Sequence, residues 1–181
     1  MAVVPLSLRF VRSDLTDEVP SPPHDSMTPH ARREFIRSHP RSYLGVTRAP
    51  DDVDETEGVD IDVLAAGKRF LDMLLAEGVF EPEVGPAYFV YRLEVGGHRQ
   101  TGLVCGVATD DYDSKTIRVH ERVRSERAGH LARHLRVVGA QSSPIALAFD
   151  GHPEVTTIMA KVADQAPSIL DFVDDGGLRQ S

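Results

Sequence analysis

Residues 87–108 read AYFVYRLEVGGHRQTGLVCGVA, two apolar-rich arms joined by Gly96-Gly97. A two-residue glycine turn tolerates the positive φ values that a tight hairpin requires. In the register that this turn sets, Glu94 lies opposite Arg99, Arg92 lies opposite Thr101, and Val90 lies opposite Leu103. Opposite charges that face each other across a ladder stabilise the pairing. The sequence therefore predicts an antiparallel hairpin, and its long apolar arms indicate a central place in a sheet.

The elements around this hairpin are helices and short strands. Helices are expected from Thr28-Pro29 to His39, across Val63–Leu75 with Gly78 as the stop, from a Ser125 cap to Gly139, and across Pro153–Ala163. Asp60 or Asp62 can cap the second of these helices. Strands are expected at Val3–Phe10, Tyr43–Thr47, Ile117–Val119, Ile145–Phe149 and Ile169–Val173. Together they predict an α+β (mixed α/β) fold, a mixed, largely antiparallel sheet with the central hairpin and helices packed on it.

Length and composition favour one domain. The chain has 181 residues, 41% of them hydrophobic and 27% charged, which suits a domain over residues 1–173 and a flexible tail over 174–181. The single Cys105 excludes an internal disulfide and fits a reducing compartment. No secretory signal and no bilayer-spanning run is found, so we expect a soluble protein of the cytoplasm with no membrane partner.

Charge is unevenly distributed. The net charge is −8, which disfavours nucleic acid as a partner. Six arginines against two glutamates nevertheless give residues 117–136 a charge of +4 and leave −12 on the rest of the chain. An acidic stretch over residues 51–62 is typical of a solvated loop.

The basic segment is the first candidate site. Arg118, Arg122 and Arg124 precede the helix expected from Ser125, and Arg127 lies in its first turn. Guanidinium groups bind phosphate or carboxylate bidentately, and a helix N-terminus adds backbone donors. These four arginines are therefore candidates to converge on one anion. The alternative is a solvated helix face paired with the acidic stretch, which is the commoner fate of a charge run.

The sequence evidence for other candidate side chains is weaker. Glu121, next to His120, can act as a general base beside a bound anion, or can be an exposed loop residue. His130 and His134 share a helix face at a spacing that metals use, but no third ligand completes a set, so no metal site is predicted. No glycine-rich phosphate loop and no nucleophile elbow occurs. Cys105 lies within an apolar strand and is expected to be inert.

Several segments resemble a known family in the order in which they occur. They are Ser21-Pro22-Pro23-His24-Asp25, Ser38-His39-Pro40, Pro86–Tyr91, Thr101-Gly102-Leu103, His120-Glu121-Arg122 and Ser143-Pro144-Ile145. This order resembles domain-of-unknown-function family 1015 of bacteria and archaea. Members of that family are about twice as long, and their later half carries a motif like that of the free serine kinases of the ParB/sulfiredoxin-like superfamily.

The resemblance implies that residues 117–173 are part of a phosphotransfer-like subdomain, with Glu121 at the position of the catalytic carboxylate. The chain departs from the family pattern at five places, and it ends before the second motif of the kinases. These departures are His24 for Tyr, Val123 for Thr, Arg127 for Lys, His130-Leu131 for Asp-Arg, and Gln141 for Asn.

Two functional hypotheses follow. The first is a divergent or incomplete member that binds an anionic, phosphate-bearing ligand or a second subunit that supplies the missing half. The second is a phosphotransferase acting on a hydroxyl such as that of serine, with Glu121 as base and the arginines as phosphate clamp. The cofactor is not defined by the sequence; ATP or ADP with its Mg would serve the second hypothesis. A DNA-binding role is a third alternative, and the net charge weighs against it.

Overall fold

The computed structural model describes residues 3–22, 26–47, 62–120, 124–141, 144–174 and 176–181. The chain divides into two compact units. The sheet unit comprises Met1–Ser13, Glu81–Glu121 and Ile145–Ser181, and the helical unit comprises Asp14–Phe80 and Arg122–Pro144. The fold is mixed α+β, with five α-helices and small antiparallel sheets in the described part of the chain. None of the described helices is both long and apolar enough to cross a membrane.

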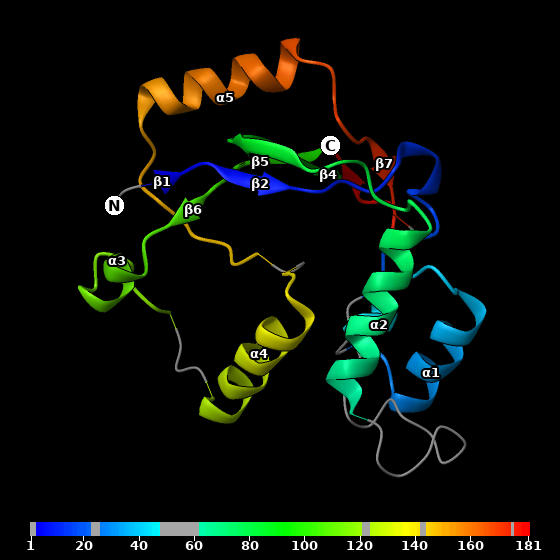
Figure 1. Cartoon of the computed structure of the whole chain (residues 1–181). Helices are drawn as coiled ribbons and strands as arrows, with labels where there is room; N and C mark the ends of the chain where they lie inside the picture. The colour runs from blue at the N-terminus through cyan, green and yellow to red at the C-terminus, as the bar shows by residue number, and fades with distance from the viewer. Residues whose placement is uncertain (1–2, 23–25, 48–61, 121–123, 142–143, 175) are drawn as a thin grey trace. The chain divides into compact units, whose positions relative to one another are not determined.

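The predicted hairpin is the centre of the sheet unit. Strands β4 (Phe89–Val95) and β5 (His98–Val104) pair antiparallel, with Glu94 opposite Arg99, Arg92 opposite Thr101 and Val90 opposite Leu103, which confirms the predicted register. Gly96 and Gly97 have φ values of 56° and 79°, as the tight turn requires. Figure 1 shows this hairpin beneath α5 (Pro153–Gln165), a helix that the sequence also predicted.

The last residues of the chain extend this sheet. β8 (Arg179–Gln180) pairs with both β4 and β7 (Phe172–Val173), which gives the strand order β5-β4-β8-β7. The polar composition of residues 174–181 had indicated a loose tail. Backbone pairing across the sheet provides order here that composition does not reveal, because the amide of Arg92 donates to the carbonyl of Ser181 over 2.7 Å.

The first predicted strand is present but interrupted. β1 (Val3–Val4) pairs with β6 (Gly106–Val107), and β2 (Leu6–Leu8) pairs with β3 (Val84–Ala87). Pro5 separates β1 from β2, since proline has no amide hydrogen to give to a ladder. The strand expected over residues 3–10 is thus divided between two small sheets.

Three predicted strands are wrong in whole or in part. Residues 117–119 and 145–149 are irregular, and Ile145 and Phe149 are 72% and 56% exposed, so apolar composition alone does not make a strand there. Residues 43–47 form a 3-10 helix, η3 (Tyr43–Gly45), because the side chain of Ser42 caps the amide of Leu44. A short helix, α3 (Thr109–Asp113), was not expected.

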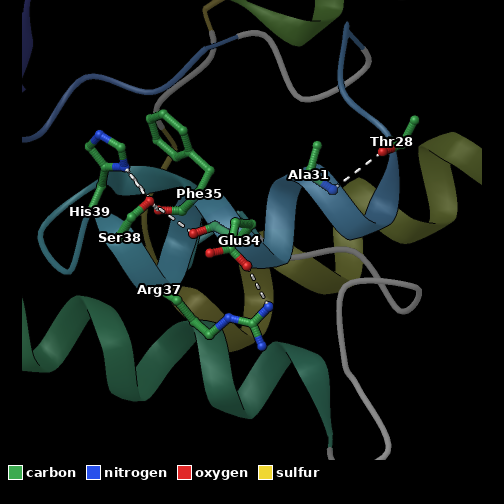
Figure 2. Close-up of polar contacts among 7 residues, drawn as sticks. All are labelled: Thr28, Ala31, Glu34, Phe35, Arg37, Ser38 and His39. Atoms are coloured by element: carbon green, nitrogen blue, oxygen red, sulfur yellow. Dashed lines mark hydrogen bonds and ion pairs between the residues drawn. The ribbon is translucent and has the colours of Figure 1, made fainter.

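The helical unit begins with a well-capped helix. After η1 (Ser13–Leu15), α1 (Pro29–Ser38) starts where Thr28 Oγ1 accepts a hydrogen bond from the amide of Ala31 over 3.3 Å. It ends at His39, whose amide donates to the carbonyl of Phe35, immediately before Pro40. Figure 2 shows both ends of α1, and the predicted limits are confirmed.

Helices α2 (Val63–Ala76) and α4 (Ser125–Val138) pack on each other in the helical unit. Asp62 caps α2 by accepting from the amides of Leu64 and Ala65, and Gly139 ends α4 in the left-handed conformation, as predicted. The buried core of this unit is aliphatic: Leu15, Val19, Ile36, Leu44, Val46, Leu71, Leu74, Val79 and Val138. It holds nearly all the fully buried hydrophobic side chains of the described chain, whereas the sheet unit contributes Met159.

Candidate anion-binding segment

The predicted basic segment is divided between the two units. Arg118 lies in the sheet unit, and Arg124 and Arg127 lie in the helical unit. Glu121 and Arg122 lie outside the described residues. Each unit is described by itself, so the convergence of the four arginines on one anion stays a prediction.

The first turn of α4 is the described part of this segment. Arg124 occupies the N-cap position, and no side chain of the described residues caps the helix there. The prediction that Ser125 is the cap is therefore wrong by one residue, because Ser125 is already the first helical residue. A helix start without a side-chain cap leaves its first amide groups available to water or to a ligand. Those amides belong to a turn that contains Arg124 at its N-cap and Arg127 in its third helical position.

The arginines of this turn differ in their ion pairing from most other described arginines. Arg124 and Arg127 are exposed and form no ion pair in the part of the chain that the structure describes. By contrast, Arg41 bridges Glu18 and Glu77, Arg99 pairs with Glu94, and Arg179 pairs with Asp171. Unpaired guanidinium groups around free amides give positive potential that no described carboxylate neutralises. The turn is suited to hold a phosphate or carboxylate group.

His120 is exposed and lies in the sheet unit, in a bend outside any helix or strand. Its neighbour Glu121 lies outside the described residues, so the general-base role remains a prediction. Two of the family departures, His24 and Val123, likewise lie outside the described residues.

One of the two histidines of α4, His134, has a structural role. His134 Nε2 lies 3.3 Å from the carbonyl oxygen of Val46, and a carbonyl only accepts, so this nitrogen carries the proton and donates. His134 thereby ties α4 to the segment after η3. The described residues contain no group of three or more His, Cys, Asp or Glu side chains that could hold a metal ion.

A hydroxyl and an imidazole also meet at the end of α1. Ser38 Oγ lies 3.0 Å from His39 Nδ1, a spacing compatible with a nucleophile and its base. However, Ser38 Oγ donates to the carbonyl of Glu34 over 2.9 Å, and His39 Nδ1 lies 3.1 Å from the carbonyl of Phe35. The ring of His39 also stacks on that of Phe35 at 4.0 Å (Figure 2). Both groups therefore terminate the helix, and the imidazole nitrogen that faces the hydroxyl is not free to accept its proton.

Cys105 is partly buried at the end of β5, and burial raises the pKa of its thiol. A raised pKa lowers the fraction of reactive thiolate at neutral pH. This agrees with the expectation of an inert residue.

Sequence reasoning missed Arg92 as a functional candidate. It was placed only as a partner of Thr101 in the hairpin, yet it is a largely buried cation in the middle of β4, with 18% of its side chain exposed. The available signal was a lone arginine inside the apolar run FVYRLEV, because a charge is rarely buried without a specific partner.

The fold and these surfaces define a mixed α+β protein with a hairpin-centred sheet unit, a helical unit and an open basic helix start. Residues 6–181 match the family DUF1015, described as a protein of unknown function, and the chain belongs to this family. Comparison with curated proteins and with solved structures finds no match.

Proposed function

We propose that this member of the DUF1015 family binds a small anionic, phosphate-bearing ligand at the start of α4. The observation that carries the proposal is that Arg124 and Arg127 are exposed at the start of α4, with no ion pair and no side-chain cap among the described residues. In a chain of net charge −8, such a turn is a local reversal of sign that attracts anions. Arg118 and Arg122 are proposed to complete the site.

The experiment is a thermal-shift titration with inorganic phosphate, ADP and ATP. A ligand that binds only the folded chain raises the apparent Tm by mass action. The double variant Arg124→Gln/Arg127→Gln is expected to lose most of that shift. Arg136→Gln, at the opposite end of the same helix, is the matched control and is expected to keep it.

Chloride at equal ionic strength separates binding from general screening. Equal Tm shifts with phosphate, nucleotides and chloride would contradict the proposal, as would loss of the shift in Arg136→Gln alone.

A phosphotransferase reaction is the more specific form of this proposal. It rests on the position of Glu121 in the family pattern and on the similarity that the pattern implies to the ParB/sulfiredoxin-like serine kinases. Glu121 would accept the proton of a substrate hydroxyl. The oxygen of that hydroxyl would take the γ-phosphoryl group of ATP, and ADP would leave. ATP turnover in the presence of serine that Glu121→Gln abolishes would support it, and equal turnover by that variant would remove Glu121 from the reaction.

Binding of a second subunit is the other candidate, and the sheet unit carries its evidence. Large apolar side chains are exposed on α5, on the irregular segments that flank it and on β7, namely Ile145, Phe149, Ile158, Ile169 and Val173. Apolar exposure on this scale is typical of interaction surfaces. Light scattering of the purified chain, compared with an Ile158→Glu/Ile169→Glu variant, tests whether these residues hold a partner copy.

A further inference from the structure

The sheet unit has a partly open cavity of about 290 Å³, lined by its sheet, by α5 and by the segment that follows α5. All of its lining residues belong to this one unit. Most are apolar, and the aromatic and aliphatic ones include Phe10, Tyr88, Phe89, Val162, Ile169 and Leu170. Ligand pockets are typically about 300–1,000 Å³, so this volume is suited to a molecule of few atoms and not to a peptide.

One cationic side chain lines this cavity. Arg92 lies in the middle of β4, with 18% of its side chain exposed, and its Nη2 donates to Asp164 Oδ1 on α5 over 3.0 Å. Arg92 Nε is buried and has no hydrogen-bond partner; it is the one such side-chain nitrogen or oxygen among the described residues. Buried donors are almost always paired, so an acceptor for this nitrogen is the feature that the site lacks.

The shape of a guanidinium group defines that acceptor. Its Nε–H lies beside an Nη–H on one edge, and this edge matches the two oxygens of a carboxylate. Asp164 accepts from one of these donors with one oxygen. Its side chain is 66% exposed, so water can solvate the Asp164 carboxylate when another carboxylate replaces it beside Arg92. No other cation lines the cavity to balance a second negative charge.

We propose that this cavity binds a small monocarboxylate with an apolar body, anchored by Arg92. The apolar part lies among the aromatic and aliphatic side chains, and the carboxylate accepts from Arg92 Nε after it has displaced Asp164 and the guanidinium has turned toward the cavity. The site is separate from the start of α4, and the ligand class is different. A phosphate-bearing ligand is not expected here, because its second negative charge would find no second cation in a mostly apolar lining.

The test is isothermal titration of the full chain with 3-phenylpropionate and octanoate, each beside its neutral alcohol. Each acid is expected to bind at least about tenfold more tightly than its alcohol, because a charge-assisted hydrogen bond is added. Equal affinities of acid and alcohol, or no binding of either acid at millimolar concentration, would overturn the proposal.

Three variants assign the roles. Arg92→Gln is expected to weaken acid binding at least about tenfold and to leave alcohol binding unchanged. Asp164→Asn breaks the same ion pair but leaves the guanidinium in place, so acid binding is expected to persist or tighten. Ala163→Leu fills the cavity from α5 and is expected to abolish binding of both acid and alcohol.

These outcomes separate a ligand anchor from a structural ion pair. A purely structural role for Arg92 predicts equal losses in Arg92→Gln and Asp164→Asn, and that result would contradict the proposal. If Arg92→Gln does not fold, the comparison of acid with alcohol in the natural chain and in Asp164→Asn still decides. Arg127→Gln is expected to leave acid binding unchanged, which distinguishes this cavity from the anion site of α4.

Discussion

Gly67 in α2 lies so close to the backbone of Val46 that a Cβ added to the glycine would stand 2.5 Å from the Val46 carbonyl oxygen. Real Cβ atoms do not approach backbone oxygen so closely, so α2 and the segment after η3 would have to move apart. We predict that Gly67→Ala destabilises the chain by about 1–3 kcal/mol, as overpacking of a close contact does. Urea unfolding followed by circular dichroism measures this.

Gly129 in α4 is the matched control for that prediction. It is also a helical glycine, but a Cβ there would meet nothing within 4 Å. Gly129→Ala is expected to stabilise the chain by about 0.5–1 kcal/mol, since alanine loses less backbone entropy in a helix. Destabilisation of similar size in both variants would show that the close contact of Gly67 with Val46 is not its cause.

The apolar stripe of α4 gives a second prediction. Ala128, Leu131, Leu135 and Val138 form one apolar stripe in the sequence of α4, yet Leu135 is 48% exposed and Val138 is 2% exposed. We expect Val138→Ala to cost about 2 kcal/mol through lost burial and a cavity. Leu135→Ala is expected to stay within about 0.5 kcal/mol, as exposed substitutions do. Chemical denaturation of the two variants compares the costs, and an equal cost would mean that Leu135 is covered in solution.

Local signals explain which parts of the fold could be predicted. The hairpin register follows from Gly96-Gly97 and the charges beside it, and the limits of α1 follow from Thr28-Pro29 and Pro40. Neither depends on distant residues. Residues 43–47 also looked like a strand, but Gly45 lies under the ring of Phe70 in α2, a tertiary contact that no local pattern reveals.

The candidate sites divide in the same way. The arginines of α4 could be predicted because charge and a helix start are both visible in the sequence. The position of Arg92 in an apolar strand was visible as well, but its role was not, because that role depends on Asp164, which is far away in the chain, and on the cavity between α5 and β4. Contacts between side chains of distant segments arise from tertiary packing. The sequence therefore identifies the individual residues but does not predict that they lie together.

Helix capping provides a third prediction. Asp62 Oδ1 accepts from the amides of Leu64 and Ala65 at 3.1 and 3.3 Å, whereas Ser125 makes no capping bond to α4. Asp62→Ala is expected to lower the free energy of unfolding by about 1 kcal/mol. Ser125→Ala, which removes a hydroxyl next to a helix start without a capping role, is expected to change it by less than about 0.5 kcal/mol. Thermal unfolding of both variants tests this, and a larger loss in Ser125→Ala would restore Ser125 as the cap.

The edge of the four-stranded sheet gives a pH-dependent prediction. Arg179 donates to Asp171 through Nε at 2.8 Å and Nη2 at 2.5 Å, and this bidentate hydrogen bond lowers the pKa of Asp171. A carboxyl group with a lowered pKa in the folded chain stabilises the fold above its unfolded pKa of about 4, and this stabilisation is lost as the pH falls through the folded pKa. The pairing of β7 with β8 should therefore weaken below about pH 4. Carboxyl-carbon NMR titration is expected to find the pKa of Asp171 below its ordinary value and to return it toward that value in Arg179→Gln. An Asp171 pKa that does not respond to Arg179→Gln would show that the ion pair is not held in solution.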